Sequence, residues 1–491
     1  MSEPIARQAG SALFWKATEH GGVKAIMVIR LFILARLLSP DDFGLMAVSL
    51  VAVEILAGLT DFGMIPALVQ RPHADSRHYE AAWTVGLLRA LVISGAVLVS
   101  APLVARMYAE PRAVALIQVI ALRPLLEALA SVKVAELIRD LRLRSLTYIR
   151  LPEAIVSAVV AAGLAPLLGV WALVWGALTG TATVVVLSYC VAPWRPRLSL
   201  DREATRSLIQ FGRWLYLAGV IGLVSSSLVS LIVSRQLGTA ALGIYTLGAR
   251  LAYLPAEISG SVIPDVTFPL YARLQRDLRK MARAFRSVLV GSFALLLPSS
   301  VLLIALAPAL VGDVLGPKWD ATVPIIRILT VVSIIGFLGD AIFPVLKGVG
   351  KPRRLAVVEA VQTPVLIACL YFFSAHWGLP GAALASVPAV VAAQLMYCWF
   401  AKDLLADSVG SALRPLLVIA ALSAAGGAAA WGLCALMPGL FGLVVAAMLS
   451  LGGVAVIFWS VAQRSDLGLL DDLALAFPAL AGRLRLTNRR S

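Results

Sequence analysis

The chain has 491 residues, of which 60% are apolar or aromatic and 14% are charged, whereas soluble proteins average about 25% charged residues. This composition excludes a soluble enzyme, a disordered chain and a small disulfide scaffold, and it predicts an all-α polytopic membrane protein. The net charge of +15 is attributed to membrane topology and not to nucleic-acid binding, because cytoplasmic loops of membrane proteins collect Lys and Arg.

Apolar segments separated by charged or Pro/Gly turns follow one another along the chain. Segments 154–194 and 415–463 contain no charged residue or histidine, and each is about twice the roughly 20 residues that one helix needs to cross a bilayer. Each segment must therefore hold two helices, with turns at Pro166 to Gly169 and at Pro438-Gly439; a similar turn is expected at Pro380-Gly381. The sequence predicts fourteen spans, at 21–38, 43–69, 81–105, 113–135, 148–168, 171–193, 208–234, 241–266, 284–312, 322–346, 355–376, 379–400, 413–436 and 439–463.

The basic residues of the connections indicate the orientation of these spans. Lys and Arg collect in the even-numbered connections, for example over 139–150 and 273–286, which places those connections and both termini in the cytoplasm. The tail 464–491 is expected to form a basic amphipathic helix at an anionic membrane surface. The opposite side receives only Arg36, Arg106, Arg112, Arg235 and Lys318.

The chain also resembles itself at an offset of 199 residues. The block 34–44 reappears without gaps as 233–243, with Arg36 matching Arg235 and Gly44 matching Gly243. This repeat predicts two pseudo-symmetric six-helix bundles of the same membrane orientation, with a substrate site between them. The predicted domains are an N-terminal bundle at 1–207, a C-terminal bundle at 208–402, two additional helices at 403–463 and the cytoplasmic tail at 464–491.

Charged residues inside the spans are the candidate functional residues, because a charge near the bilayer centre usually faces a cavity or a partner. Arg30 lies near the middle of its span with no acidic residue in the same helix, and Arg89 and Arg250 lie at similar depths. Arginines from both halves that face one interior would form a basic cavity suited to phosphate, which a guanidinium binds in bidentate fashion.

Structural explanations compete with this hypothesis. An ion pair of Arg30 with Glu54 or Asp61 would need no ligand. Arg123 and Glu127, four residues apart on one helix face, would neutralise each other. Snorkelling to the headgroups accounts for residues near span ends, namely Lys133, Asp265 and Glu359. Other charges within spans include Lys24, Glu257, Arg327 and Asp340.

Motifs of catalysis or metal binding are missing from the sequence. No paired-carboxylate, Ser/His/Asp or Cys/His arrangement has catalytic spacing, and no metal-ligand pattern occurs. We therefore expect no enzymatic activity, no cofactor and no bound metal.

Two stretches near the N-terminus carry a resemblance to a known family. Ile33-Leu-Ala-Arg-Leu-Leu-Ser-Pro-Asp-Asp-Phe-Gly-Leu-Met46 and Asp61-Phe-Gly-Met-Ile-Pro-Ala-Leu-Val-Gln-Arg71 closely resemble the opening of bacterial Wzx-like polysaccharide flippases. These belong to the multidrug/oligosaccharidyl-lipid/polysaccharide (MOP) exporter superfamily. Segments 237–245 and 268–277 are similar to the same family. Such motifs identify a family well and a substrate poorly.

The resemblance implies two six-helix bundles around a central cavity, followed by two extra helices. It implies transport of undecaprenyl-diphosphate-linked oligosaccharide repeat units across the bacterial inner membrane by alternating access, for exopolysaccharide, O-antigen or capsule synthesis. The implied partners are this lipid-linked oligosaccharide, membrane lipids, and a polysaccharide polymerase with its export machinery.

The resemblance also suggests roles for individual residues. Basic residues in the first and eighth spans of related flippases are thought to hold the diphosphate, and Lys24, Arg30 and Arg250 lie in the corresponding helices; Arg89 joins them as a substrate-binding candidate. Coupling to protons or sodium is common in the superfamily, and the candidates for it are Glu54, Asp61 and Asp340.

Two other functions stay open at this point. A drug or cation antiporter of the same superfamily would favour acidic groups in its cavity, whereas the mid-span arginines indicate an anion. A membrane polysaccharide polymerase or glycosyltransferase normally needs sizeable loops with catalytic residues outside the membrane, and no outward connection exceeds about ten residues.

Overall fold

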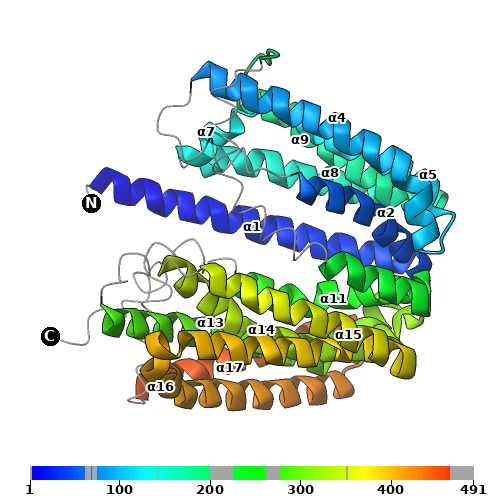
Figure 1. The fold of residues 1–491 in the computed structure, drawn as a ribbon. Helices are drawn as coiled ribbons and strands as arrows, with labels where there is room; N and C mark the ends of the chain where they lie inside the picture. The colour runs from blue at the N-terminus through cyan, green and yellow to red at the C-terminus, as the bar shows by residue number, and fades with distance from the viewer. Residues whose placement is uncertain are drawn as a thin grey trace. The chain divides into compact units, whose positions relative to one another are not determined.

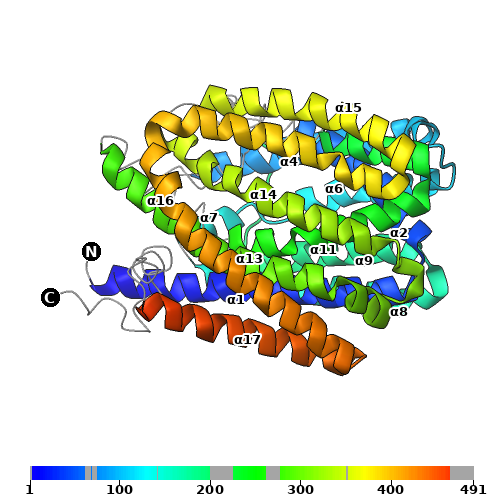
Figure 2. The ribbon, with the colours of Figure 1, turned by 90° about the horizontal axis from the view of Figure 1, so that it is seen from below.

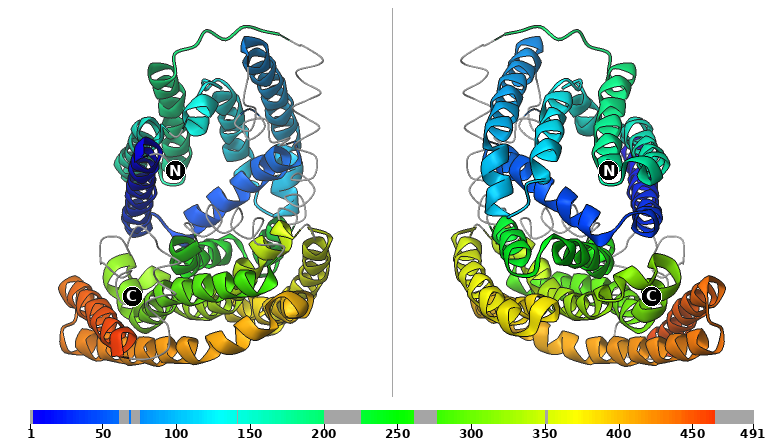
Figure 3. Two further views of the ribbon diagram at one scale, coloured as in Figure 1. Left: turned by 90° about the vertical axis from the view of Figure 1, so that its left-hand side faces the viewer. Right: turned by 90° about the vertical axis from the view of Figure 1, so that its right-hand side faces the viewer.

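The computed structural model describes residues 3–60, 68, 75–140, 142–199, 225–260, 277–349 and 352–464. These residues form helices and turns, and none of them lies in a β-strand (Figure 1). The chain divides into two compact units, residues 1–243 and 244–491, each of which is described by itself. Figure 3 looks along several of the long helices, while others, such as the orange α16, cross the view at an angle.

The first unit combines long helices with three short ones. α8 packs along both α1 and α9, and α2 and α4 pack against α5. Residues 225–237 are also helical and lead into α11, Thr239–Gly260, whose first five residues belong to this unit. The bounds of the other helices are α1 Glu3–Leu37, α2 Pro40–Leu59, α4 Ser76–Met107, α5 Ala113–Ile120, α6 Leu122–Ala128, α7 Val134–Arg139, α8 Leu143–Leu168 and α9 Trp171–Val191.

The second unit contains the rest of α11 and longer helices. α13 packs against α14 and α16, and α17 packs against α16. α13 continues into a π-helix at Leu310–Leu315, and a short 3-10 helix at Pro317–Trp319 precedes α14. The remaining bounds are α13 Leu278–Ala309, α14 Thr322–Gly348, α15 Pro352–Leu384, α16 Ser386–Leu436 and α17 Leu440–Arg464.

Seven of the described helical segments are long and apolar enough to cross a membrane. Each overlaps a span expected from the sequence, so a nearly all-helical polytopic membrane fold is confirmed, while the count of fourteen stays a prediction. The seven are 76–107, 144–168, 171–191, 279–315, 322–346, 353–384 and 410–436.

The predicted span at 113–135 is interrupted in the structure. Pro124 has no amide N–H, and the chain turns at Ala121 between α5 and α6. After α6 a second break is stabilised from α9: the Ser131 amide donates to the Ser188 hydroxyl at 2.9 Å, and the Ser131 hydroxyl donates to the Ala192 carbonyl at 2.9 Å. Apolar composition predicted a single helix here, but these hydrogen bonds support a broken one.

Two turns share a backbone conformation that favours glycine. Gly169, between α8 and α9, has φ 55° and ψ −129°, and Gly378 within α15 has φ 59° and ψ −140°. The second turn was expected at Pro380-Gly381, but the chain reverses two residues earlier. Gly381 is needed as well, since a Cβ there would overlap the Phe373 carbonyl oxygen.

α16 joins two predicted spans without a non-helical loop. Its 51 residues correspond to about 76 Å of straight helix, far more than the roughly 30 Å of a bilayer core. Figure 2 shows that this helix bends sharply between its two halves. Its second half packs on α13 and α17, where Gly427 faces Val301 and Gly426 faces Val454.

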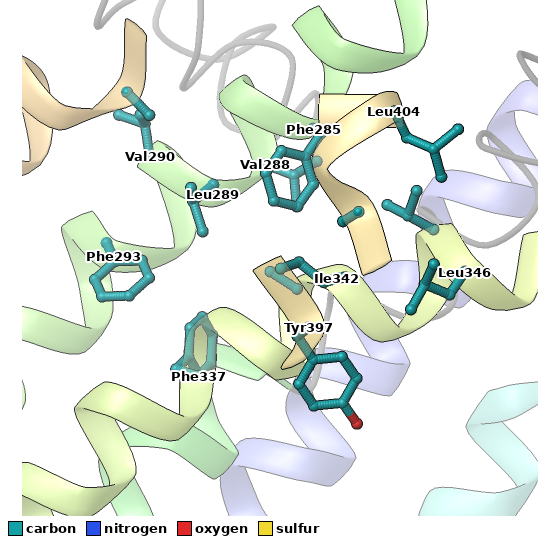
Figure 4. Close-up of a cluster of buried hydrophobic side chains, with 14 of the residues drawn as sticks. Phe285, Val288, Leu289, Val290, Phe293, Phe337, Ile342, Leu346, Tyr397 and Leu404 are labelled. Carbon is teal, nitrogen blue, oxygen red and sulfur yellow. The ribbon is translucent and has the colours of Figure 1, made fainter. Parts of the chain in front are cut away.

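The core of the second unit lies where α13, α14 and α16 meet (Figure 4). Phe293 and Phe337 are buried there with their rings edge to face and their centroids 5.5 Å apart. In contrast, large apolar side chains such as Val99 and Leu167 are exposed. Outward apolar and inward packed surfaces are what a lipid-embedded bundle requires, because its helices associate through close packing.

Candidate functional site

Arg30 contacts a neighbouring helix in the interior of the first unit. The half-buried side chain projects from α1, and its Nη1 donates a hydrogen bond of 2.8 Å to Oγ of Ser157 on α8. Ser157 is buried, near the middle of α8. Among the predicted substrate-binding residues, Arg30 is therefore placed at the contact between α1 and α8.

Glycines allow the three helices around this contact to approach closely. On α1, a Cβ at Gly22 would lie 2.8 Å from a methyl of Leu151. On α9, a Cβ at Gly176 would lie 2.9 Å from the Ser157 carbonyl oxygen, and one at Gly180 would lie 2.9 Å from the Ser157 Cβ. Small residues four apart are a common way for membrane helices to pack closely.

Lys24 and Glu54 belong to the same unit as Arg30. Lys24 is half-buried on α1, six residues before Arg30, which places the two about 120° apart around the helix axis. Glu54 is exposed on α2. The predicted coupling residue Asp61 lies outside the described residues, as does Asp265.

Arg89 is bound to the end of a helix. From α4 its Nη2 donates to the Ala57 carbonyl oxygen at 2.8 Å, and its Nε donates to the Thr60 hydroxyl at 3.0 Å. The Thr60 hydroxyl in turn donates to the Leu56 carbonyl at 2.7 Å. These groups terminate α2, whose last carbonyls have no donor within the helix.

Arg327 makes a similar contact in the second unit. Its Nε donates to the Ile304 carbonyl oxygen of α13 at 3.2 Å. Pro308 follows four residues later and lacks the N–H that would have bonded to that carbonyl. The arginine thus supplies a donor that the proline removes.

The other predicted charges of the second unit lie on three helices. Arg250 and Glu257 are exposed on α11, Asp340 is exposed on α14, and Glu359 is half-buried on α15. Arg250 and Asp340 therefore belong to a different unit from Arg30, Lys24 and Arg89.

One ion pair expected from the sequence forms in the structure, and Lys133, which was expected to extend to the headgroups, lies beside a carboxylate. Arg123 Nε lies 2.9 Å from Glu127 Oε1 on α6, which confirms the predicted pairing four residues apart. Lys133 Nζ lies 3.9 Å from Glu136 Oε1. Among the described residues, no group of three or more His, Cys, Asp or Glu side chains is arranged to hold a metal ion.

The motif around Ser39 organises one end of the first unit. Ser39 and Asp42 form a reciprocal capping box at the start of α2, and Pro40 occupies its first turn. Asp41 accepts hydrogen bonds of 2.8 Å from Nη1 of Arg112 and 2.8 Å from the hydroxyl of Thr239.

Glu110 completes this polar cluster. Its carboxylate binds Arg112 Nε at 2.6 Å and Nη2 at 2.9 Å, and it accepts from the Thr239 hydroxyl at 3.2 Å. Hydrogen bonding to Arg112 holds the pKa of Glu110 below its ordinary value, and burial opposes this shift. The same carboxylate, with Asp41, raises the pKa of Arg112. We call Asp41, Glu110, Arg112 and Thr239 the outer cluster, after its predicted side of the membrane.

The backbone segments that carry Gly44 and Gly243 come into close contact beside the outer cluster. A Cβ on Gly44 would overlap the Thr239 carbonyl oxygen, and a Cβ on Gly243 would overlap the Pro40 carbonyl oxygen. The offset of 199 pairs Pro40 with Thr239 and Gly44 with Gly243. The contact is therefore reciprocal in the register of the predicted repeat.

The sequence interpretation missed Ser157, Thr60 and the outer cluster as partners. A hydroxyl in an apolar run is too common to single out, but Gly176 and Gly180 in the adjacent predicted span were a signal of close packing. Asp41 lay inside a quoted motif, with nothing in the sequence to show that Arg112 would bind it.

Long apolar helices, several of them with charged side chains bonded to a neighbouring helix, define a polytopic α-helical membrane protein. The family of polysaccharide biosynthesis proteins matches residues 33–324, more than half of the chain. The chain belongs to this family, and the predicted resemblance to bacterial polysaccharide transporters is confirmed.

Three relatives have names that describe export or synthesis of polysaccharides. The succinoglycan biosynthesis transport protein ExoT of Rhizobium meliloti (strain 1021) is 26% identical over 360 residues, 72% of each chain. The lipopolysaccharide biosynthesis protein WzxC of Escherichia coli (strain K12) is 24% identical over 336 residues, 67% of each chain. The teichuronic acid biosynthesis protein TuaB of Bacillus subtilis (strain 168) is 21% identical over 434 residues, 85% of this chain and 88% of that protein.

Solved structures share the fold. The lipid II flippase MurJ in an inward closed conformation has a TM-score of 0.71 at 14% identity, covering 92% of this chain and 99% of MurJ. An inward-facing multidrug resistance transporter of the MATE family in the MOP superfamily has a TM-score of 0.62 at 15% identity, covering 79% of this chain and 94% of that one. These similarities establish a MOP-type fold.

Proposed function

We propose that this protein is a flippase that moves undecaprenyl-diphosphate-linked oligosaccharide repeat units across the bacterial inner membrane by alternating access. Membership in the polysaccharide biosynthesis family supports a sugar-bearing substrate, and ExoT is named as a transport protein. The observation that carries the proposal is the Arg30 guanidinium of α1, which a serine hydroxyl of α8 holds at the contact between the two helices.

The chemistry of such a substrate explains why a protein is needed. A diphosphate and several sugars cannot cross about 30 Å of hydrocarbon unaided, because each polar group would lose its hydration. A polyprenyl tail can remain in the lipid during the same movement. An arginine held inside the bundle supplies the positive charge and the forked N–H donors that a diphosphate requires.

The proposed architecture has fourteen spans, with two six-helix bundles, two additional helices and both termini in the cytoplasm. Lys24 and Arg30 would contribute to the basic cavity from the first bundle, and Arg250 from the second. Arg89, also a substrate-binding candidate by its depth, would mainly hold the end of α2. A polysaccharide polymerase and its export machinery are the proposed recipients of the translocated unit.

The outer cluster supports alternating access. In the proposed topology, Asp41 and Arg112 lie on the outer side, where they and Thr239 tie the start of α2 to the start of α11. We expect these hydrogen bonds to break in an outward-open state. Such exposed ion pairs suit a reversible closure, because each contributes little stability alone.

Carboxylates within the predicted spans are the candidates for ion coupling. Glu54, Asp61 and Asp340 are the carboxylates proposed to bind a proton or sodium ion. A carboxylate within a membrane span is costly unless it serves a pathway or a partner. Single replacements by Asn or Gln, assayed for flipping with and without each ion gradient, would assign the role.

Reconstitution in liposomes tests the proposed function. A fluorescent lipid-diphosphate oligosaccharide is incorporated, and its accessibility in each leaflet is followed with time. The wild-type protein should accelerate translocation, and Arg30→Ala should reduce it to the protein-free rate. Arg327→Ala is the matched control, because it removes another arginine from within a predicted span and should keep wild-type translocation. Protein-dependent drug efflux without lipid translocation would favour an antiporter instead.

A further inference from the structure

Ser157 lies between α1, which carries Arg30, and two glycines of α9, Gly176 and Gly180. Its side chain is 3% exposed, and its Oγ accepts the 2.8 Å hydrogen bond from Nη1 of Arg30. A hydrogen bond with a charged donor is stronger than one between neutral groups. The contact joins α1 to α8 within the first unit.

Two glycines of α9 pack closely against Ser157 on the side of α8 that faces α9. A Cβ at Gly180 would lie 2.9 Å from the Ser157 Cβ and 3.2 Å from its Oγ. A Cβ at Gly176 would lie 2.9 Å from the Ser157 carbonyl oxygen and 2.7 Å from the Ala161 Cβ. Both glycines therefore form a flat seat on α9, and the turn of α8 that carries Ser157 rests against it.

A hydroxyl that is held in place by packing can orient a guanidinium that bonds to it. Arginine has a long side chain with many rotamers, so a flexible guanidinium loses entropy when it binds a ligand. Fixing one nitrogen of the planar fork restricts its rotation before the ligand arrives. A serine hydroxyl does this without adding a negative charge at the contact, whereas a carboxylate in the same place would offset the positive charge.

We infer that Ser157 is a positioning residue that orients the Arg30 guanidinium toward the diphosphate of the substrate, with Gly176 and Gly180 as its seat. This inference rests on the proposed function, since it assigns a role at the proposed phosphate site. It predicts that Ser157 acts on binding only through Arg30.

A double-mutant cycle tests this dependence. The Kd for undecaprenyl diphosphate is measured for the purified full-length chain in detergent, as wild type, Ser157→Ala, Arg30→Ala and the double variant. Ser157→Ala should raise Kd about fivefold in the wild-type background, the order of one hydrogen bond. In the Arg30→Ala background the same substitution should change Kd less than twofold, because coupled residues are not additive.

Two further variants separate positioning from folding. Gly180→Ala leaves the hydroxyl in place but pushes on it, and it should also raise Kd only when Arg30 is present. Ser49→Ala is the matched control: Ser49 is fully buried on α2, and its hydroxyl bonds to the Leu45 carbonyl of its own helix. This control should keep the wild-type Kd, and Tm measurements on all variants identify any loss of folding.

The outcomes distinguish the inference from the proposed function. If Arg30→Ala binds undecaprenyl diphosphate as well as wild type does, the proposed function fails, and the inference fails with it. If Arg30→Ala loses binding while Ser157→Ala keeps the wild-type Kd, only the inference is overturned. Equal losses from Ser157→Ala in both backgrounds would likewise overturn it.

Discussion

Arg30 and Arg89 are the same residue type at similar depths of predicted spans in the first unit, yet they contact different kinds of acceptor. Arg30 donates to a serine side chain of a neighbouring helix, whereas Arg89 donates to the backbone and the capping hydroxyl at the end of α2. The difference teaches that predicted depth in the membrane identifies an arginine as a functional candidate, and that the position of its hydrogen-bond acceptor then indicates its role. An arginine that completes a helix end supports the fold, and one that bonds to a hydroxyl near the middle of a neighbouring helix is better suited to receive a ligand.

The largest expected effect belongs to Arg30. In cells, Arg30→Ala should lower polysaccharide export at least tenfold, because the proposed phosphate site loses its charge. Arg30→Lys should keep the charge but lose the fork, and should give an intermediate export level. Export is measured as surface polysaccharide, with protein abundance determined on the same membranes. Wild-type export by Arg30→Ala at normal abundance would remove the contrast with Arg89.

Arg89→Ala should act mainly on stability. The Ala57 carbonyl and the Thr60 hydroxyl each lose a charged donor, which costs about 1 to 3 kcal/mol for groups left unsatisfied in a bundle. We expect a lower Tm in detergent and lower abundance, with translocation per folded molecule reduced less than by Arg30→Ala. A normal Tm combined with lost translocation would instead place Arg89 in the substrate site, as first predicted from its depth.

Arg112 extends the comparison to an arginine held by carboxylates. The pKa of Glu110 is lowered from 4.5, so ionised Glu110 contributes stability that is present above pH 4.5 and lost as the pH falls through the lowered value. Glu110→Gln should therefore lower Tm by about 1 to 2 °C at pH 7. The Tm difference from wild type should shrink below pH 4.5, and a difference independent of pH would contradict the assigned pairing.

Arg327 should give the smallest effect. Its single described acceptor is the Ile304 carbonyl, which lacks a helical donor because residue 308 is proline. The arginine side chain itself is exposed. Arg327→Met should cost about 1 kcal/mol or less and leave translocation unchanged. Thermal unfolding of Arg327→Met beside Arg89→Ala would test whether a helix-end acceptor matters more than a mid-helix one.

Much of the helical layout was predictable from composition. The long uncharged segment 154–194 forms α8 and α9, with the reversal at Gly169 as expected. The break of the fourth span was not predicted, because it depends on Ser188 of α9 bonding to the Ser131 amide. Such a partner is far away in sequence, and hydropathy carries no information about it.

The candidate site was predictable only in part. Arg30 was identified by its depth, because a charge in an apolar helix is rare and costly. Ser157 was not identified, since its role depends on the rotation of α8 relative to α1. The rotation follows from close packing on Gly176 and Gly180, and packing of this kind is specified by the whole helix surface.

The close contact of Gly44 and Gly243 has a consequence for how the chain tolerates change. Each glycine leaves space for a backbone carbonyl of the segment that carries the other glycine, so the contact has the self-complementary form of an isologous interface. A side chain added to either glycine damages the same junction, and adding one to both offers no compensation.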